Sequence, residues 1–135
     1  YYDYIILDCP PSINVFTKCA LIAADEFIIP VDVGYFSILG LKQLMEEIER
    51  IKEEYNTSLT LRGILPCKVD KRTTLSNQII QLLKEHFPSK VFRTSIRASV
   101  DIIRSQIAQK NIFEYNPKSP AAKDFISLTE EIING

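Results

Sequence analysis

Four apolar runs along the chain predict β-strands. The run Glu26–Val33 is continuous rather than alternating, as in strands that are buried on both faces of a sheet. Tyr4–Leu7 and Leu59–Val69 are two further runs, and Val91–Ile96 is shorter and more polar, which suits an edge strand. The first of these strands opens the chain and is followed at once by two prolines, which end it.

Helical periodicity fills the stretches between these runs. It is clearest in Ser37–Tyr55, where apolar residues recur every three or four positions and acidic residues occupy the other face. The last helix is expected to begin at Ser119, an N-cap residue followed by proline at the first helical position. Asn111–Lys118 is expected to be a surface loop. The other predicted helices are Ser12–Ala24, Thr74–Phe87 and Ser99–Gln109.

Strands that alternate with helices of this length predict βαβ units and a mainly parallel sheet in a three-layer α/β sandwich. The 135 residues are expected to belong to one domain. Nucleotide-binding folds of this kind use a Gly-rich phosphate loop, but the four glycines of this chain form neither GxxxxGK[ST] nor GxGxxG. The sequence therefore predicts an α/β fold of nucleotide-binding type without its phosphate loop.

Composition and charge narrow the class of protein. Apolar residues make up 46% and charged residues 24%, which excludes disordered and collagen-like chains. No apolar run approaches the ~18 residues of a membrane span, so a cytoplasmic protein without membrane contact is expected. Three cysteines without CxxC spacing argue against a disulfide framework or a zinc site. Residues 68–104 carry eight basic and three acidic side chains, which is typical either of a polyanion-binding face or of an ordinary solvated surface.

Asp8 is the first candidate for chemistry, because it directly follows a predicted strand. Ligands in open α/β sheets bind beyond the carboxyl ends of strands, so an acid here can face a metal ion or a phosphate. A carboxylate in this position can hold hydrated Mg²⁺ or orient water. The alternatives are a helix-capping role and, in a receiver-like domain, a phosphoacceptor, although the usual acidic cluster beside such an acceptor is missing.

Two further strand ends carry polar residues. Val31–Ser37 combines an acid, a glycine and two aromatic residues, which fits either a loop that responds to phosphate or a connector that packs on the core. Cys67–Asp70 partly matches the N-K-x-D motif that reads guanine, but the leading asparagine is missing. Lys71 and Arg72 precede a predicted helix N-terminus, and Arg97 follows the last predicted strand, so these cations can form a patch for nucleic-acid backbone. A platform on which bases stack requires aromatic residues among the cations, and the sequence has no aromatic residue interleaved with these three.

Several segments together resemble the ParA/Soj/MinD family of deviant Walker ATPases, and most closely its ParA/Soj partitioning branch. The resemblance covers essentially the whole chain. Each matching segment alone is only moderately specific for the family, but their combination is specific. The matching segments are Tyr2–Ser12 (YDYIIIDTPPS in the family), Ala20–Val31 (NALxAAD…IPV), Tyr35–Leu41 (EYxALEGL), Val69–Thr73 (xDxRT) and Phe113–Ser119 (I/VFEYxPxS).

The resemblance implies a P-loop-type fold and an activity. Members of the family bind ATP with Mg²⁺, form homodimers around the nucleotide, bind DNA nonspecifically, and hydrolyse ATP when a ParB-type partner stimulates them. Such proteins segregate chromosomes or plasmids. Residue by residue, Asp8 falls on the Walker B aspartate, which implies that it binds Mg²⁺ through water, and Arg72 falls on a basic position linked to DNA binding. Lys71 and Arg97 are the other candidate DNA-binding residues.

The resemblance also implies that adenine lies near two strand ends, so the candidate nucleotide-binding residues are Pro66, Cys67, Lys68, Ile96 and Arg97.

The chain also departs from the family pattern. The signature KGGVGKT and the later DxDPQ segment have no counterpart here. Gly34 stands where the family has glutamate, and Asp101 lies near the position of a second DNA-linked arginine. We therefore expect residues 1–135 to correspond to the C-terminal part of one ParA-type ATPase domain that is inactive by itself and prone to self-association. The alternative is a non-catalytic α/β module that contacts DNA or a partner protein.

Overall fold

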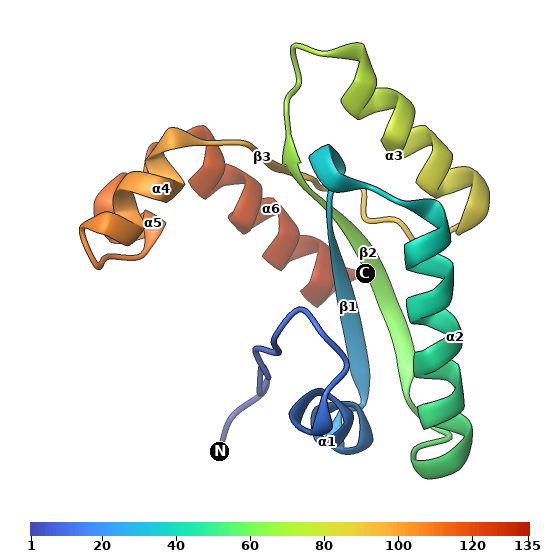
Figure 1. The fold of residues 1–135 in the computed structure, drawn as a ribbon. Helices are drawn as coiled ribbons and strands as arrows, with labels where there is room; N and C mark the ends of the chain where they lie inside the picture. The colour runs from blue at the N-terminus through green and yellow to red at the C-terminus, as the bar shows by residue number, and fades with distance from the viewer. The chain divides into compact units, whose positions relative to one another are not determined.

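The computed structural model describes residues 1–135 as an α/β structure, in which three strands lie in the order β1-β2-β3 (Figure 1). The strands are β1 (Glu26–Asp32), β2 (Thr60–Val69) and β3 (Ile96–Arg97). The helices are α1 (Val15–Ala23), α2 (Ile38–Tyr55), α3 (Thr74–His86), α4 (Val100–Ile107), α5 (Ile112–Tyr115) and α6 (Pro120–Asn134), and η1 (Val33–Tyr35) is a single 3-10 turn. The expected α/β class and the parallel sheet are confirmed.

The fourth predicted strand is much shorter than its sequence run. Val91 forms one isolated parallel bridge with Ile64, and regular pairing with β2 resumes only at β3. Between these points the Glu131 carboxylate of α6 accepts the backbone N–H groups of Arg93 (2.8 Å) and Thr94 (2.9 Å). Because a side chain takes these donors, the segment cannot continue the ladder with β2 there.

The predicted first strand, Tyr4–Leu7, is wrong. These residues have no strand conformation, and their side chains are exposed, with Ile6 at 90% of its full accessible surface. Strand conformation needs a neighbouring strand to accept its backbone hydrogen bonds, and no strand of the sheet pairs with this segment. The apolar sequence is therefore a strand former without a partner in this structure.

The helix boundaries mostly agree with the sequence signals. Ser37 and Ser119 are N-caps, and each hydroxyl accepts a backbone N–H of its helix, from Gly40 and Ala121 respectively. At α1 the cap is Asn14 rather than Ser12, so the helix begins two residues later than a Ser12 cap predicts. The stretch predicted as a loop, Asn111–Lys118, contains the one-turn helix α5.

The chain divides into two compact units. The first comprises Tyr1–Phe27 and Ser37–Arg62, in which α1 packs against α2. Asn56, the C-cap of α2, donates its side-chain amide to the carbonyls of Leu21, Ile22 and Ala24. Since the last carbonyls of a helix lack partners within it, Asn56 satisfies the end of α1 and ties it to α2.

The second unit comprises Ile28–Phe36 and Gly63–Gly135. Its core contains Leu65, Phe92 and Ile96, against which apolar side chains of α6 pack. A β-carbon at Gly63 would lie 2.6 Å from the Phe92 ring, so only glycine allows the ring to approach the strand so closely. In neither unit does a helix combine the length and apolarity of a membrane span.

Candidate functional site

Two strand ends in the second unit bring the predicted nucleotide-binding residues together. In the parallel pairing of β2 with β3, Cys67 lies opposite Ile96, and Val69 lies opposite Arg97. The side chains of Pro66 and Ile96 are buried. Their side chains therefore support this edge of the sheet from the core, and a ligand at the edge would contact the more exposed residues beside them.

Lys68 is an extra residue at this edge. Two residue steps on β2, from Cys67 to Val69, face a single step on β3, so Lys68 forms a bulge, and its φ of 54° is left-handed. A side chain in this conformation costs on the order of 1–3 kcal/mol and persists only when other contacts hold it. Lys68 Nζ lies 2.8 Å from the Asp32 carboxylate at the end of β1.

Asp32 joins the ends of β1 and β2. One carboxylate oxygen binds Lys68, and the other accepts the backbone N–H of Gly34 at 2.9 Å, which closes the turn η1. The Lys68 hydrogen bond, supported by the Gly34 N–H, holds the pKa of Asp32 below its ordinary value, and the same bond raises the pKa of Lys68. The loop after β1 is thus fixed to the end of β2. Val33 of this loop is buried and Tyr35 is exposed.

Cys67 lies half-buried next to this ion pair. Burial raises the pKa of the Cys67 thiol, and the Asp32 charge raises it further. A reactive cysteine needs a lowered pKa, so this environment disfavours the thiolate and fits a structural thiol.

The turn after β2 carries two exposed cations, Lys71 and Arg72. Arg72 is 89% exposed, and its Nε and Nη2 bind the two carboxylate oxygens of Asp70 at 3.0 and 3.1 Å. Arg72 also donates its backbone N–H to Asp70, and these bonds hold the pKa of Asp70 below its ordinary value. The guanidinium is therefore held in one orientation at the surface, while Lys71 enters none of the ion pairs.

Arg97, predicted for both nucleotide and DNA, is bound to a carboxylate of its own unit. Asp124 on α6 accepts its Nε at 2.7 Å, its Nη2 at 2.8 Å and its backbone N–H at 3.1 Å. Burial opposes ionisation of Asp124, but these donors outweigh it and hold the pKa of Asp124 below its ordinary value of 3.8. In this structure Arg97 fixes the end of β3 to α6.

The sequence reasoning missed Asp124 and Glu131, the two carboxylates of α6 that organise this edge. They lie seven residues apart, which is two helical turns, so they share the face that α6 turns toward β3. The sequence did contain one indication that these acids have partners: both lie within the apolar stripe of an amphipathic helix, and a buried carboxylate needs hydrogen-bond partners. Their targets are the backbone N–H groups of residues 93 and 94, before β3, and of residue 97 within it, and the sequence did not indicate these groups as the partners.

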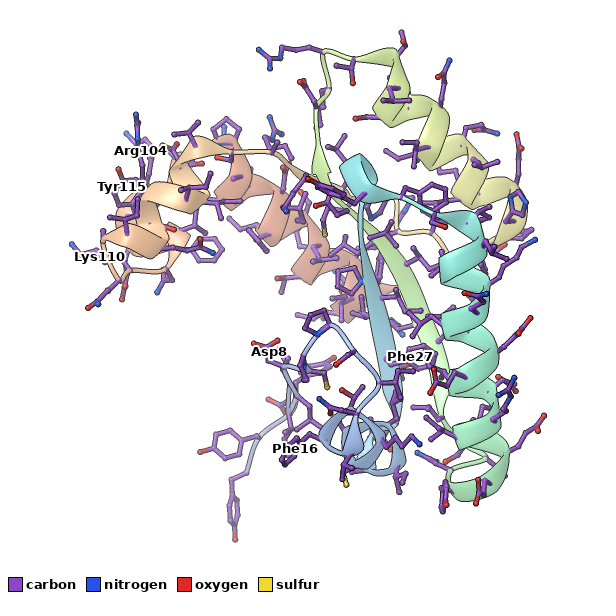
Figure 2. The ribbon with its side chains drawn as sticks, viewed as in Figure 1. Asp8, Phe16, Phe27, Arg104, Lys110 and Tyr115 are labelled. Atoms are coloured by element: carbon purple, nitrogen blue, oxygen red, sulfur yellow. The ribbon has the colours of Figure 1, made fainter.

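Asp8, the predicted Mg²⁺ ligand, belongs to the first unit. Figure 2 shows it on the extended segment before α1, and its side chain is exposed. Mg²⁺ is commonly held by one or two carboxylates together with water and phosphate oxygens, and an exposed carboxylate fits that mode. No group of three His, Cys, Asp or Glu side chains in the structure forms a metal site by itself. Asp8 is therefore a single exposed carboxylate in the structure, and its role as a Mg²⁺ ligand stays a prediction.

The chain resembles several proteins of known sequence. A family model described as an AAA domain matches residues 1–61. The sporulation initiation inhibitor protein Soj of Bacillus subtilis is 37% identical over 97% of this chain and 52% of its own length. The chromosome partitioning protein ParA of Caulobacter vibrioides is 33% identical over 98% of this chain and 50% of its own, and the chromosome-partitioning ATPase Soj of Thermus thermophilus is 36% identical over 98% and 53%. The chain spans about half the length of the curated relatives it matches.

The fold also resembles solved structures. Cobyrinic acid a,c-diamide synthase from Mycobacterium smegmatis, with a bound ATP analog and magnesium, superimposes with a TM-score of 0.63 and 30% identity. That match covers 68% of this chain and 37% of the other. The structure of the same enzyme with ADP and magnesium gives the same TM-score at 25% identity, over 77% of this chain and 48% of the other.

Proposed function

This chain belongs to the ParA/Soj-type P-loop ATPase family, and we propose from that premise that the protein acts in ATP-dependent partitioning of DNA. In this proposal the whole protein binds ATP and Mg²⁺, dimerises, contacts DNA without sequence preference and responds to a ParB-type partner. Its cargo is a chromosome or a plasmid, and it works in the cytoplasm. The observation that carries the proposal is similarity to Soj and ParA proteins over 97–98% of the chain.

The nucleotide contact that we propose lies at the ends of β2 and β3. Lys68 presents a side chain at this edge, whereas Pro66 and Ile96 are buried and contribute shape. When bound, Mg²⁺ would neutralise phosphate charge, and Asp8 would hold it through water. The 135 residues contain no Gly-rich phosphate loop, so we expect this chain alone not to hydrolyse ATP. Turnover well above that of an Asp8→Ala variant would refute this expectation.

The DNA contact that we propose is the turn with Lys71 and Arg72. Arg72 is 89% exposed, and although Asp70 holds two of its nitrogens, Nη1 takes part in neither bond. A guanidinium pre-oriented in this way can donate to a phosphate with little loss of conformational freedom. Arg97 would act indirectly, because its donors are held by Asp124.

The test is binding of a fluorescent DNA duplex by anisotropy over a series of salt concentrations. Arg72→Ala should weaken binding about equally for unrelated sequences and should reduce the salt slope by about 1, since one phosphate contact is lost. The matched control is Lys84→Ala, because Lys84 is an exposed cation in the last turn of α3, roughly 15 Å along the helix from Thr74. Unchanged binding by Arg72→Ala would remove Arg72 from the DNA site.

A second function is a non-catalytic binding module. The exposed cations of residues 71 and 72 favour it, because they need neither nucleotide nor Asp8 to contact DNA. Duplex binding that is equal with and without ATP, and equal in Asp8→Ala, would support the module. Binding that requires ATP would favour the partitioning ATPase.

A further inference from the structure

Tyr35 is an exposed aromatic ring on a rigid support at the same edge as the cations of the second unit. Its side chain is 90% exposed. Its backbone lies in η1, where Asp32 accepts the N–H of Gly34 and binds Lys68, and where Val33 is buried. η1 also contacts α3, the helix that follows Lys71 and Arg72. Packing within the unit does not account for a large apolar ring held in water on a fixed turn.

We propose that this edge binds single-stranded nucleic acid, with an unpaired base stacked on the Tyr35 ring and the neighbouring phosphates bound by Lys71 and Arg72. Base–aromatic stacking combined with a cationic track is the general means by which proteins bind single strands without sequence preference. The sequence separates Tyr35 from Lys71 by more than thirty residues. Only the pairing of the β1 and β2 ends brings the ring and the cations to one edge.

The geometry favours stacking over a protein contact for two reasons. First, the Asp32 contacts hold the backbone turn that carries the ring, so a base that stacks on the ring orders only the Tyr35 side chain and no loop backbone. Second, the cations beside it suit phosphate: the Tyr35 hydroxyl is near enough to Lys68 to contribute to the raised pKa of that amine, while Lys71 and Arg72 face solvent. A duplex keeps its bases inside the stack, so the ring should act on single strands only.

This inference goes beyond the proposed duplex contact, and anisotropy with three probes of equal length separates the two. The probes are oligo-dT, a duplex, and an abasic strand that has phosphates but no bases. Tyr35→Ala should weaken oligo-dT binding about 5- to 150-fold, the range expected for loss of one stacked base, and should leave the duplex and the abasic strand within twofold. Tyr35→Phe should keep oligo-dT binding, since it keeps the ring.

The control variant is Tyr55→Ala. Tyr55 is exposed at the end of α2, but Glu54 beside it raises its pKa, so it lies in an acidic setting where a phosphate strand is repelled. Equal losses on all three probes in Tyr35→Ala would overturn the inference, because the ring would then act through the fold. Displacement of oligo-dT by low concentrations of AMP would also overturn it, by assigning the ring to a free nucleotide. Wild-type binding to duplex but not to oligo-dT would refute the stacking and leave the proposed DNA contact standing.

Discussion

Replacing Asp124 by asparagine tests the ion pair that organises the end of β3. The Arg97 side chain is 31% exposed and the Asp124 side chain 9%, which is the lowest exposure of any side chain in the ion pairs of the chain. Asp124 accepts three hydrogen bonds from Arg97, two of them from the guanidinium. The substitution removes the charge and turns an amide N–H group toward donors, so it leaves part of Arg97 without a partner.

The magnitude follows from the partial burial. Breaking a fully buried pair costs about 3–5 kcal/mol because the remaining charge is stranded. Arg97 is about a third exposed and can recover water, and asparagine keeps one acceptor oxygen, so we expect a loss of about 2–3 kcal/mol in the free energy of unfolding. Urea unfolding at pH 7, followed by far-UV circular dichroism, should show a midpoint lowered by roughly 1–2 M.

The control is Glu130→Gln. Glu130 is an exposed acid on the same helix and enters none of the ion pairs, so its loss should change the free energy of unfolding by less than about 0.5 kcal/mol. Arg97→Met should destabilise as well, and combining it with Asp124→Asn should recover part of the loss, because the pair then leaves no buried charge. An Asp124→Asn variant as stable as the control, or strict additivity in the double variant, would refute the reasoning.

Three further predictions concern other parts of the structure. Gly63→Ala should lower the free energy of unfolding by about 1–3 kcal/mol in a urea titration, because the added β-carbon overlaps the Phe92 ring. The control Gly40→Ala, within α2, should be neutral or stabilising. Equal effects of the two substitutions would contradict the proposed overlap. Stability should fall as the pH drops below about 4.5, because burial raises the pKa of Glu131 but its backbone N–H donors and Arg93 outweigh burial and hold that pKa below its ordinary value of 4.5. The stability that a depressed native pKa contributes is fully present above the unfolded pKa and is lost as the pH falls through the native pKa. Glu131→Gln should flatten this part of a curve of melting temperature against pH, and an unchanged curve would exclude Glu131 as the cause. Asn56→Ala should expose the end of α1 to faster amide hydrogen exchange, because three carbonyls lose their donor, and unaltered exchange there would argue against the cap.

The sequence was sufficient for elements whose signals are local. Ser37 and Ser119 begin helices as their residue types predict, because an N-cap is decided by one side chain and the next three backbone N–H groups. β1 and β2 lie within a residue of the predicted runs, since continuous apolar segments of this length favour buried strands. The capping hydrogen bonds span only two or three residues along the chain, and the apolar runs of β1 and β2 are continuous in the sequence.

The failures share one cause, which is dependence on a distant partner. Tyr4–Leu7 has the composition of a strand, but a strand exists only if another strand accepts its hydrogen bonds. Val91–Ile96 is interrupted because Glu131, far along the chain, takes two of its N–H groups. Periodicity reports which face of an element is apolar and carries no information about which group arrives to satisfy its backbone.

The same distinction applies to the site. The sequence alone placed Asp8, Arg72 and Arg97 after predicted strands and, through family resemblance, gave each an expected role. Only the tertiary structure decided that Arg97 is bound by Asp124 while Arg72 stands at the surface, and that Tyr35 and Lys68 belong to the same compact unit. The physical reason is that residue type determines what a side chain can bind, whereas the strand order and the packing of α6 determine which partner lies within hydrogen-bonding distance.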